Sequence, residues 1–276
     1  MNRSVRLILR DICIFLFSTF IFCGKVDGVT PVKPLELKIM SFNIQYGNDY
    51  WGESNLRTVL TIIEEEKPHL IAFQAVDSVE VNGRVRHRLK QLALQTGMYY
   101  SYGAAEEIVG GTQGVGILSR FPLSKTQKFA LPDSPSATQS TPTVSPRVLL
   151  CTFLEYAMGR GLRFCCSRIE YAAGVERAIQ AAYINGLLNE SIQPVILGVD
   201  LGARPNEQPY FSFRKKWVDT GKGSVLSTWA EGTPGDRFDY IFVLDNARMR
   251  VKEYKVIRRF PEASDHFPIV ATIELW

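Results

Sequence analysis

The order of apolar segments in this 276-residue chain predicts an α/β fold in which helices cover mixed β-sheets. Short strands alternate with amphipathic helices in the first part of the chain. Further on, strands follow one another directly, which argues against a simple parallel barrel. Apolar residues make up 46% of the chain and charged residues 22%, a balance typical of a globular protein that buries a core.

The first expected elements are short apolar strands and amphipathic helices. Leu37–Ile44 predicts a buried strand, and His69–Gln74 predicts a second one. Between them, Asn55–Glu66 carries apolar residues at helical spacing. Arg84–Thr96 shows the same spacing, so we expect a helix there, with the basic run RVRHR at its start forming a solvated face.

The rest of the chain is richer in strands. One more helix is expected at Gly174–Asn189, and Glu155–Gly161 predicts a turn between two strands. The segment Leu131–Pro146 is rich in Ser, Thr and Pro, which favours a long surface loop within one domain. The strands predicted here are Val115–Ser119, Arg147–Leu154, Leu162–Ile169, Pro194–Gly198, Phe238–Leu244 and Ile269–Leu275.

The N-terminus has the pattern of a secretory signal peptide. Three arginines precede the apolar run Ile12–Cys23, which is shorter than the roughly 20 residues of a membrane span. We expect residues 1–28 to be the signal and residues 29–276 to be a single domain, so that the protein is secreted or periplasmic. Because the cleavage region lacks an A-x-A-like pair, an uncleaved anchor, a lipoprotein at Cys23 and a cytoplasmic start stay open. No further membrane span is predicted.

Charge and cysteine content restrict the classes of partner. Without residues 1–28 the chain has 28 basic and 26 acidic groups, and this net charge of +2 is too small for tracking nucleic acid by bulk charge. Three cysteines remain, and an odd number argues against a disulfide framework. One bridge from Cys151 to Cys165 or Cys166 stays open, because these residues lie on strands expected to pair.

Four polar sites next to predicted strands are candidates for function. Asp265 and His266 directly precede the last strand, and Asp200 follows a buried one. A carboxylate at the carboxyl end of a strand is the usual place for a functional group in an open α/β sheet. Asn43 ends the first strand, and Asp239 lies in an apolar strand, where a buried acid needs a polar partner. Each alone could also be an ordinary turn or capping residue.

These positions belong to an ordered series of short motifs. The series is MSFNI at 40–44, LIAFQAVD at 70–77, GILSRFP at 116–122, PR at 146–147, ILGVDLGARP at 196–205, RFDYIFV at 237–243 and SDHFPIV at 264–270. It resembles the endonuclease/exonuclease/phosphatase family over nearly all of residues 35–276. The resemblance implies a four-layer α/β sandwich, with two mixed β-sheets packed face to face and helices outside, and a Mg²⁺-dependent phosphoesterase site at one edge.

The resemblance also assigns roles to the positions that match. In the family an Asn, a Glu and an Asp hold the metal, and Asn43 and Asp265 match two of these three. Asp200 matches the Asp that activates the attacking water. Asp239 matches an acid that steadies a histidine, and His266 completes the final Asp–His pair. The retained catalytic positions are therefore Asp200, Asp239 and His266.

Three positions depart from the family pattern. Ala75 stands where the family has the metal-binding Glu, Arg168 where it has a catalytic His, and Gly202 where it has an Asn that stabilises the transition state. Ala75 supplies no carboxylate and Arg168 adds a fixed positive charge, so Mg²⁺ binding is expected to be weak or absent. Removing one oxyanion donor alone typically lowers the rate by about 10²–10³.

The leading hypothesis is a secreted protein of this family with impaired catalysis, which binds a phosphorylated or other anionic ligand through Arg168 and Asn43. A guanidinium matches two phosphate oxygens, which favours this hypothesis. The alternative is an active or altered metal-dependent phosphodiesterase that acts on nucleic acid, lipid or inositol phosphodiesters. A third hypothesis also stays open: the site has lost its function, and the fold is kept because it contacts a partner. For Arg168, an ion pair with the buried acid Asp239 is expected to compete with anion binding.

Overall fold

The computed structural model describes residues 34–49, 51–132, 145–171, 174–244 and 248–276. The expected signal peptide and residues 133–144 of the expected Ser/Thr/Pro-rich loop lie outside the described residues. Within the described ranges no helix is both long enough and apolar enough to cross a membrane.

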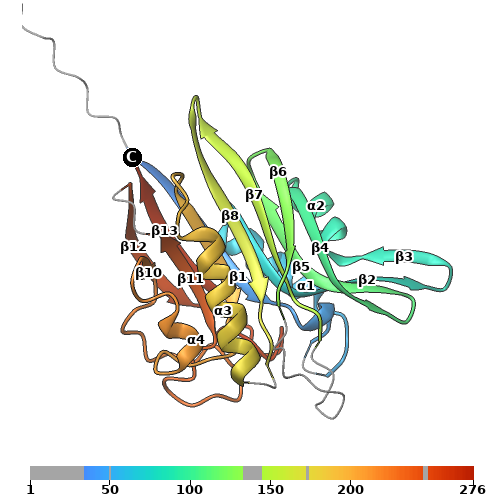
Figure 1. The fold of residues 1–276 in the computed structure, drawn as a ribbon. Coiled ribbons are helices and arrows are strands. Elements are labelled where there is room, and N and C mark those ends of the chain that lie inside the picture. Colours follow the sequence, from blue (N-terminus) through green and yellow to red (C-terminus); the bar gives the residue numbers. More distant parts are fainter. Residues whose placement is uncertain (1–33, 50, 133–144, 172–173, 245–247) are drawn as a thin grey trace, which may run out of the picture. The chain divides into compact units, whose positions relative to one another are not determined.

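A seven-stranded sheet is built around two parallel strands in its centre (Figure 1). Its order is β12-β13-β1-β2-β5-β4, and β3 pairs with the end of β2. Only β1 and β2 run parallel; the other pairs are antiparallel. The strands are β1 (Leu35–Asn43), β2 (Leu70–Val81), β3 (Arg84–His87), β4 (Tyr99–Ile108), β5 (Gly111–Ser119), β12 (Met249–Val256) and β13 (Ile269–Leu275).

A six-stranded sheet has the order β10-β11-β9-β8-β7-β6, and its one parallel pair is β8 with β9. Its strands are β6 (Leu123–Ala130), β7 (Val148–Ala157), β8 (Arg160–Arg168), β9 (Val195–Asp200), β10 (Trp217–Asp219) and β11 (Asp239–Leu244). The helices are η1 (Gln45–Gly47), α1 (Leu56–Glu66), α2 (Arg88–Thr96), α3 (Gly174–Leu188) and α4 (Gln208–Phe211).

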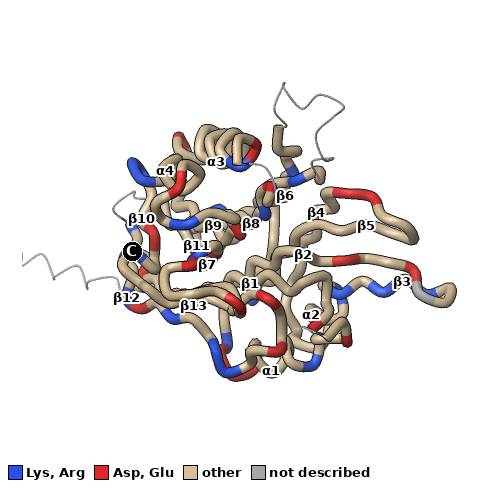
Figure 2. The backbone as a smooth tube through the Cα atoms, turned by 90° about the horizontal axis from the view of Figure 1, so that it is seen from below, with Lys and Arg blue, Asp and Glu red and all other residues tan. Residues whose placement is uncertain are grey.

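Three buried apolar clusters separate four layers, which Figure 2 shows in succession. The central cluster joins the two sheets, with Leu37 and Ile39 of β1 in the same cluster as Phe164 of β8. A second lies between α3 and the outer face of the six-stranded sheet. The third joins α1 and α2 to the seven-stranded sheet. The predicted sandwich of two mixed sheets with helices outside is confirmed.

The helix predicted at Arg84–Thr96 is wrong in its first turn. Arg84–His87 forms β3, which pairs with β2 across the two-residue turn Asn82-Gly83. Both turn residues have positive φ, at 53° and 74°, as a tight hairpin turn requires. The helix begins only at Arg88, where the His87 side chain accepts a hydrogen bond from the backbone N–H of Lys90. Asn-Gly was the sequence signal for this hairpin.

The end of the basic run RVRHR is also less solvated than expected. Arg88 is buried, and its Nε lies 3.2 Å from a carboxylate oxygen of Asp77. Arg86 pairs with the same carboxylate at 3.3 Å. The basic run therefore stabilises the β2–β3 region, and one of its arginines belongs to the protein interior.

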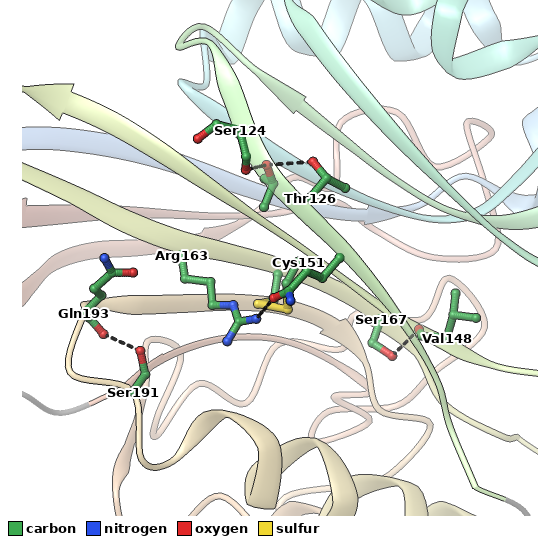
Figure 3. Close-up of a disulfide and its surroundings, with 11 residues drawn as sticks. Ser124, Thr126, Val148, Cys151, Arg163, Ser167, Ser191 and Gln193 are labelled. Atoms are coloured by element: carbon green, nitrogen blue, oxygen red, sulfur yellow. Dashed lines mark hydrogen bonds between the residues drawn. A yellow bond between two sulfur atoms is a disulfide. The ribbon is translucent and has the colours of Figure 1, made fainter.

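One disulfide links the strands β7 and β8. Cys151 and Cys165 are directly opposite in the antiparallel register and are bonded to each other (Figure 3). Cys166 is a buried free thiol. The alternation of side chains along a strand explains this choice, because Cys165 faces α3 and Cys166 faces the other sheet. Of the alternatives left open by the sequence, the structure has Cys151–Cys165.

Candidate active site

Three of the predicted site residues lie in a row across the six-stranded sheet. Arg168 at the end of β8 is in register with Asp200 at the end of β9. Asp200 is in turn opposite Asp239, the first residue of β11. Because residues in register on neighbouring strands point to the same face, these side chains start at one level at one edge of the sandwich.

The other sheet supplies the remaining polar groups. Asn43 ends β1, and its amide Nδ2 donates a hydrogen bond of 2.9 Å to Asp200 Oδ2. The loop before β13 carries Asp265 and His266, and it is fixed to β1 because Ser264 Oγ donates to the Asn43 carbonyl at 2.7 Å. The structure thus brings together Asn43, Arg168, Asp200, Asp239, Asp265 and His266 from both sheets.

Asp200 is buried and both of its oxygens are engaged. Besides Asn43, its Oδ2 lies 3.4 Å from Nε of Arg168, and its Oδ1 accepts a hydrogen bond of 3.1 Å from the Gly202 N–H. At an effective dielectric of about 20, charges at this separation attract by roughly 5 kcal/mol before desolvation is counted. The carboxylate is therefore held in a fixed orientation by a cation and two N–H groups.

Arg168 has a second partner that the sequence did not indicate. Its Nη1 donates a hydrogen bond of 2.7 Å to the hydroxyl of Tyr46, and its guanidinium lies 5.7 Å from the centre of that ring. Tyr46 belongs to η1, three residues after Asn43, and has a φ of 56°. The polar loop that follows Asn43 was the only sequence signal for this contact. No hydrogen bond from Nη2 of Arg168 is found among the residues that the structure describes.

Asp239 pairs with His266, and the competing pair of Asp239 with Arg168, which the sequence left open, is not formed. The Asp239 Oδ2 lies 2.8 Å from Nδ1 of His266, and the acid is almost fully buried. Burial opposes the charge on the imidazole, but Asp239, Asp200 and Asp265 outweigh it and raise the pKa of His266 to about 9. At neutral pH the histidine is therefore protonated. Arg168 pairs with Asp200 because these two residues are register neighbours.

Two cavities meet at Arg168 and Asp265, which line both of them. The smaller has a volume of about 210 Å³ and is also lined by Tyr171, Asp200, Gly202, Trp229, Phe238 and His266. The larger, of about 590 Å³, is also lined by Asn43, Gln45, Tyr46, Asn48, Asp49, Trp51, Gly52 and Ala75. The two aromatic side chains Trp229 and Phe238 were not predicted as part of the site.

Ala75 lies at a β-bulge in β2, between Phe73 and Val76 in the pairing with β5. Its φ of 51° is in the left-handed region, which costs a non-glycine residue roughly 1–2 kcal/mol. Bulges next to functional sites redirect a side chain, and here the bulge directs Ala75 to the larger cavity. The bulge thus presents to this cavity a side chain that has no polar atom.

Gly202 also has a positive φ, of 56°, which asparagine tolerates better than most residues. A Cβ at this position would meet nothing closer than the Cδ of Arg177 at 3.5 Å, an ordinary contact. Packing therefore does not require a glycine here.

The fold and this cluster of acids, histidine and arginine define a phosphoesterase-like sandwich. The sequence model of the Endonuclease/Exonuclease/phosphatase family matches residues 40–266, and the chain belongs to this family. Enzymes of the family typically depend on a divalent metal. Atoms of Asp200, Asp239 and His266 that could be metal ligands all lie within 4.8 Å of one another.

Solved structures share the fold at low sequence identity. An endonuclease/exonuclease/phosphatase from Beutenbergia cavernae is 17% identical with a TM-score of 0.74, over 87% of this chain and 72% of that one. A mannosyl-6-phosphatase from Bacteroides thetaiotaomicron is 18% identical with a TM-score of 0.67, over 86% and 99%. The catalytic domain of human Nocturnin, solved with a bound sulfate anion, is 17% identical with a TM-score of 0.65, over 88% and 94%. No curated protein sequence matches the chain.

Proposed function

We propose that this protein binds a phosphorylated ligand without hydrolysing it, at the two cavities that meet at Arg168. The observation that carries this proposal is that Arg168 and His266 lie on the surface of one cavity, where nearby carboxylates raise the pKa of His266 to about 9. A guanidinium and an imidazolium both donate charge-assisted hydrogen bonds to phosphate oxygens. The aromatic rings of Trp229 and Phe238 add an apolar wall for the organic part of the ligand.

A magnesium ion does not fit the residues present. Magnesium requires several oxygen ligands in near-ideal geometry, whereas Ala75 offers none and Asp200 Oδ2 is already shared by Asn43 and Arg168. Asp239 is likewise taken by His266. The positive charge of Arg168 next to Asp200 also repels a divalent ion. These contacts support weak or absent metal binding, and with it impaired catalysis.

Secretion is part of the same proposal. It rests on the apolar run behind three arginines at the N-terminus and on the Cys151–Cys165 disulfide. Disulfides persist mainly in oxidising compartments. The two observations are independent of each other and favour the same location.

An altered phosphodiesterase is the second candidate, because one part of the family's machinery is intact. His266 keeps its buried acid Asp239, and both lie close to Asp200. The proteins of similar structure include a mannosyl-6-phosphatase and a Nocturnin domain with a bound sulfate anion, which favours a phosphate ester as the ligand class in either case.

Ligand binding is tested by thermal unfolding of the wild type, Arg168→Ala and Arg163→Ala with inorganic phosphate, against chloride at equal ionic strength. Arg163 lies on the same strand β8 but lines neither cavity, so its variant is the matched control. At phosphate concentrations several times Kd, we expect Tm to rise by roughly 2–4 °C in the wild type and control only. Equal shifts in all three proteins, or none, would contradict the proposal.

Turnover is tested separately with an activated phosphodiester such as bis(p-nitrophenyl) phosphate and Mg²⁺ or Mn²⁺. We expect a kcat far below the roughly 10 s⁻¹ of an ordinary enzyme, because Ala75, Arg168 and Gly202 remove different parts of the catalytic machinery. A kcat within about tenfold of that value would favour the phosphodiesterase instead.

A further inference from the structure

We infer that the guanidinium of Arg168 takes the place of a divalent cation in this chain, so that a neutral residue at position 168 creates a metal site. This inference deepens the proposed function, because it gives the physical reason why the site excludes metal. It rests on the same cavities but does not depend on which ligand they bind.

The surroundings of Arg168 are those of a hard cation. Its partners are oxygen atoms: a carboxylate oxygen of Asp200 at 3.4 Å and the hydroxyl of Tyr46 at 2.7 Å. The carboxylate of Asp265 adds a further favourable charge interaction. Magnesium and manganese prefer oxygen ligands of this kind. The guanidinium thus lies in a group of oxygen donors that could otherwise surround a metal ion.

The charge of the site supports the same reading. In the family pattern a glutamate stands at position 75, and a carboxylate with a divalent ion has a net charge of +1. Here Ala75 has no charge and Arg168 has one positive charge, which is again +1. Both residues line the larger cavity, so the missing acid and the added guanidinium face the same space. The two departures compensate each other electrostatically.

Loss of the guanidinium leaves an acidic group without its counterion. Asp200 then keeps only the N–H donors of Asn43 and Gly202, and Asp265 lies on the same cavity surface. Asp239 stays paired with His266. A cavity with two uncompensated carboxylates attracts a divalent cation, because each close charge contributes strongly at low effective dielectric.

The experiment measures Mn²⁺ binding, by the loss of the free-ion EPR signal, to the wild type and to three variants without phosphate. Arg168→Met and Arg168→Gln remove the charge, whereas Arg168→Lys retains it. We expect Mn²⁺ to bind both neutral variants at least about tenfold more tightly than the wild type and Arg168→Lys. Their Tm should rise by roughly 2–4 °C at Mn²⁺ concentrations several times Kd.

The inference would be overturned if the folded neutral variants bound Mn²⁺ no more tightly than the wild type. Two neutral variants are included so that the comparison survives if one of them does not fold. Because no phosphate is present, a wild type that fails to respond to phosphate contradicts the proposed ligand class and leaves this inference standing.

Discussion

At the scale of single residues, three carboxylates control the protonation of His266. Its pKa is raised to about 9, against an ordinary value of 6.5. A group whose pKa is higher in the folded state stabilises the fold fully below pH 6.5, and this contribution is lost as the pH rises through 9. The pKa values of His69 and His87 are shifted in the opposite direction, chiefly by burial, so neither histidine contributes a loss of this sign.

We therefore predict that the free energy of unfolding falls between pH 6.5 and pH 9 because His266 loses its proton. The loss is on the order of 3 kcal/mol for a shift of this size. Urea unfolding of the wild type and Asp239→Asn across this range measures it. The variant lacks the charge that holds the proton, so its stability should depend less on pH. Parallel pH profiles for the two proteins would show that the pair is not the cause.

The sequence predicted which residues form the site better than it predicted the contacts between them. The positions Asn43, Asp200, Asp239, Asp265 and His266 stand out in the sequence because they follow or precede apolar strands. Which acid pairs with Arg168 depends on register, and register between strands 30 residues apart is not encoded locally. Tyr46 was missed because a loop tyrosine has no pattern that indicates its partner.

At the scale of elements, the buried arginine Arg88 joins α2 to η1 and β2. Its guanidinium pairs with Asp77 and donates hydrogen bonds to Ser54 at 2.8 Å and to Asn48 at 3.3 Å. This arrangement requires that Gly47 has no side chain, because a Cβ there would lie 2.4 Å from Nε of Arg88. The ion pair and the glycine therefore fix how α2 meets the end of the sheet.

Gly47→Ala should lower the free energy of unfolding by roughly 2–4 kcal/mol, from steric conflict with a buried ion pair and from the positive φ of 75°. Gly97→Ala is the matched control, since Gly97 has a φ of 66° but no atom within 4 Å of its Cβ position. It should cost only about 1 kcal/mol. Urea unfolding compares the two variants. Equal losses in the free energy of unfolding would mean that the side chain of Arg88 moves aside at little cost.

Central strands could be predicted from the sequence and edge strands could not. The strands β9 and β11 are buried along their whole length and consist mostly of apolar residues, and β1 is buried from Ile39 to Asn43. By contrast β6, with five consecutive exposed residues, and β12, at the edge of its sheet, have no such pattern. Edge strands carry charged residues that discourage pairing with other chains, and this hides them from a search for apolar periodicity.

At the scale of the whole molecule, the two sheets approach closely at Gly198 of β9. A Cβ at this residue would lie 2.4 Å from the Cβ of Ala72 on β2 and 3.3 Å from that of Ser41 on β1. The distance between the sheets near the site is therefore set by a glycine facing an alanine. Any larger residue must move one sheet relative to the other.

Gly198→Ala is predicted to lower the free energy of unfolding by about 1–3 kcal/mol through overpacking. Adding Ala72→Gly removes the methyl group that the new Cβ of residue 198 would meet. The double variant should therefore be more stable than Gly198→Ala alone. Urea unfolding of the two single variants and the double variant gives a coupling energy of about 0.5–3 kcal/mol. Strictly additive losses would show that the two residues do not limit the approach of the sheets.

The pairing of β1 with β13 has a consequence for biosynthesis. One edge of β1 pairs with β2, which is synthesised soon after it. The other edge pairs with β13, where Ser41 is opposite Ile269. More than 200 residues leave the ribosome between these two partners, and an unpaired strand edge promotes aggregation during that time. Asp265 and His266 directly precede β13, so the pocket assembles only when this late strand docks. We therefore expect the nascent chain to need chaperones until β13 has been synthesised, and docking of this strand also completes the ligand site.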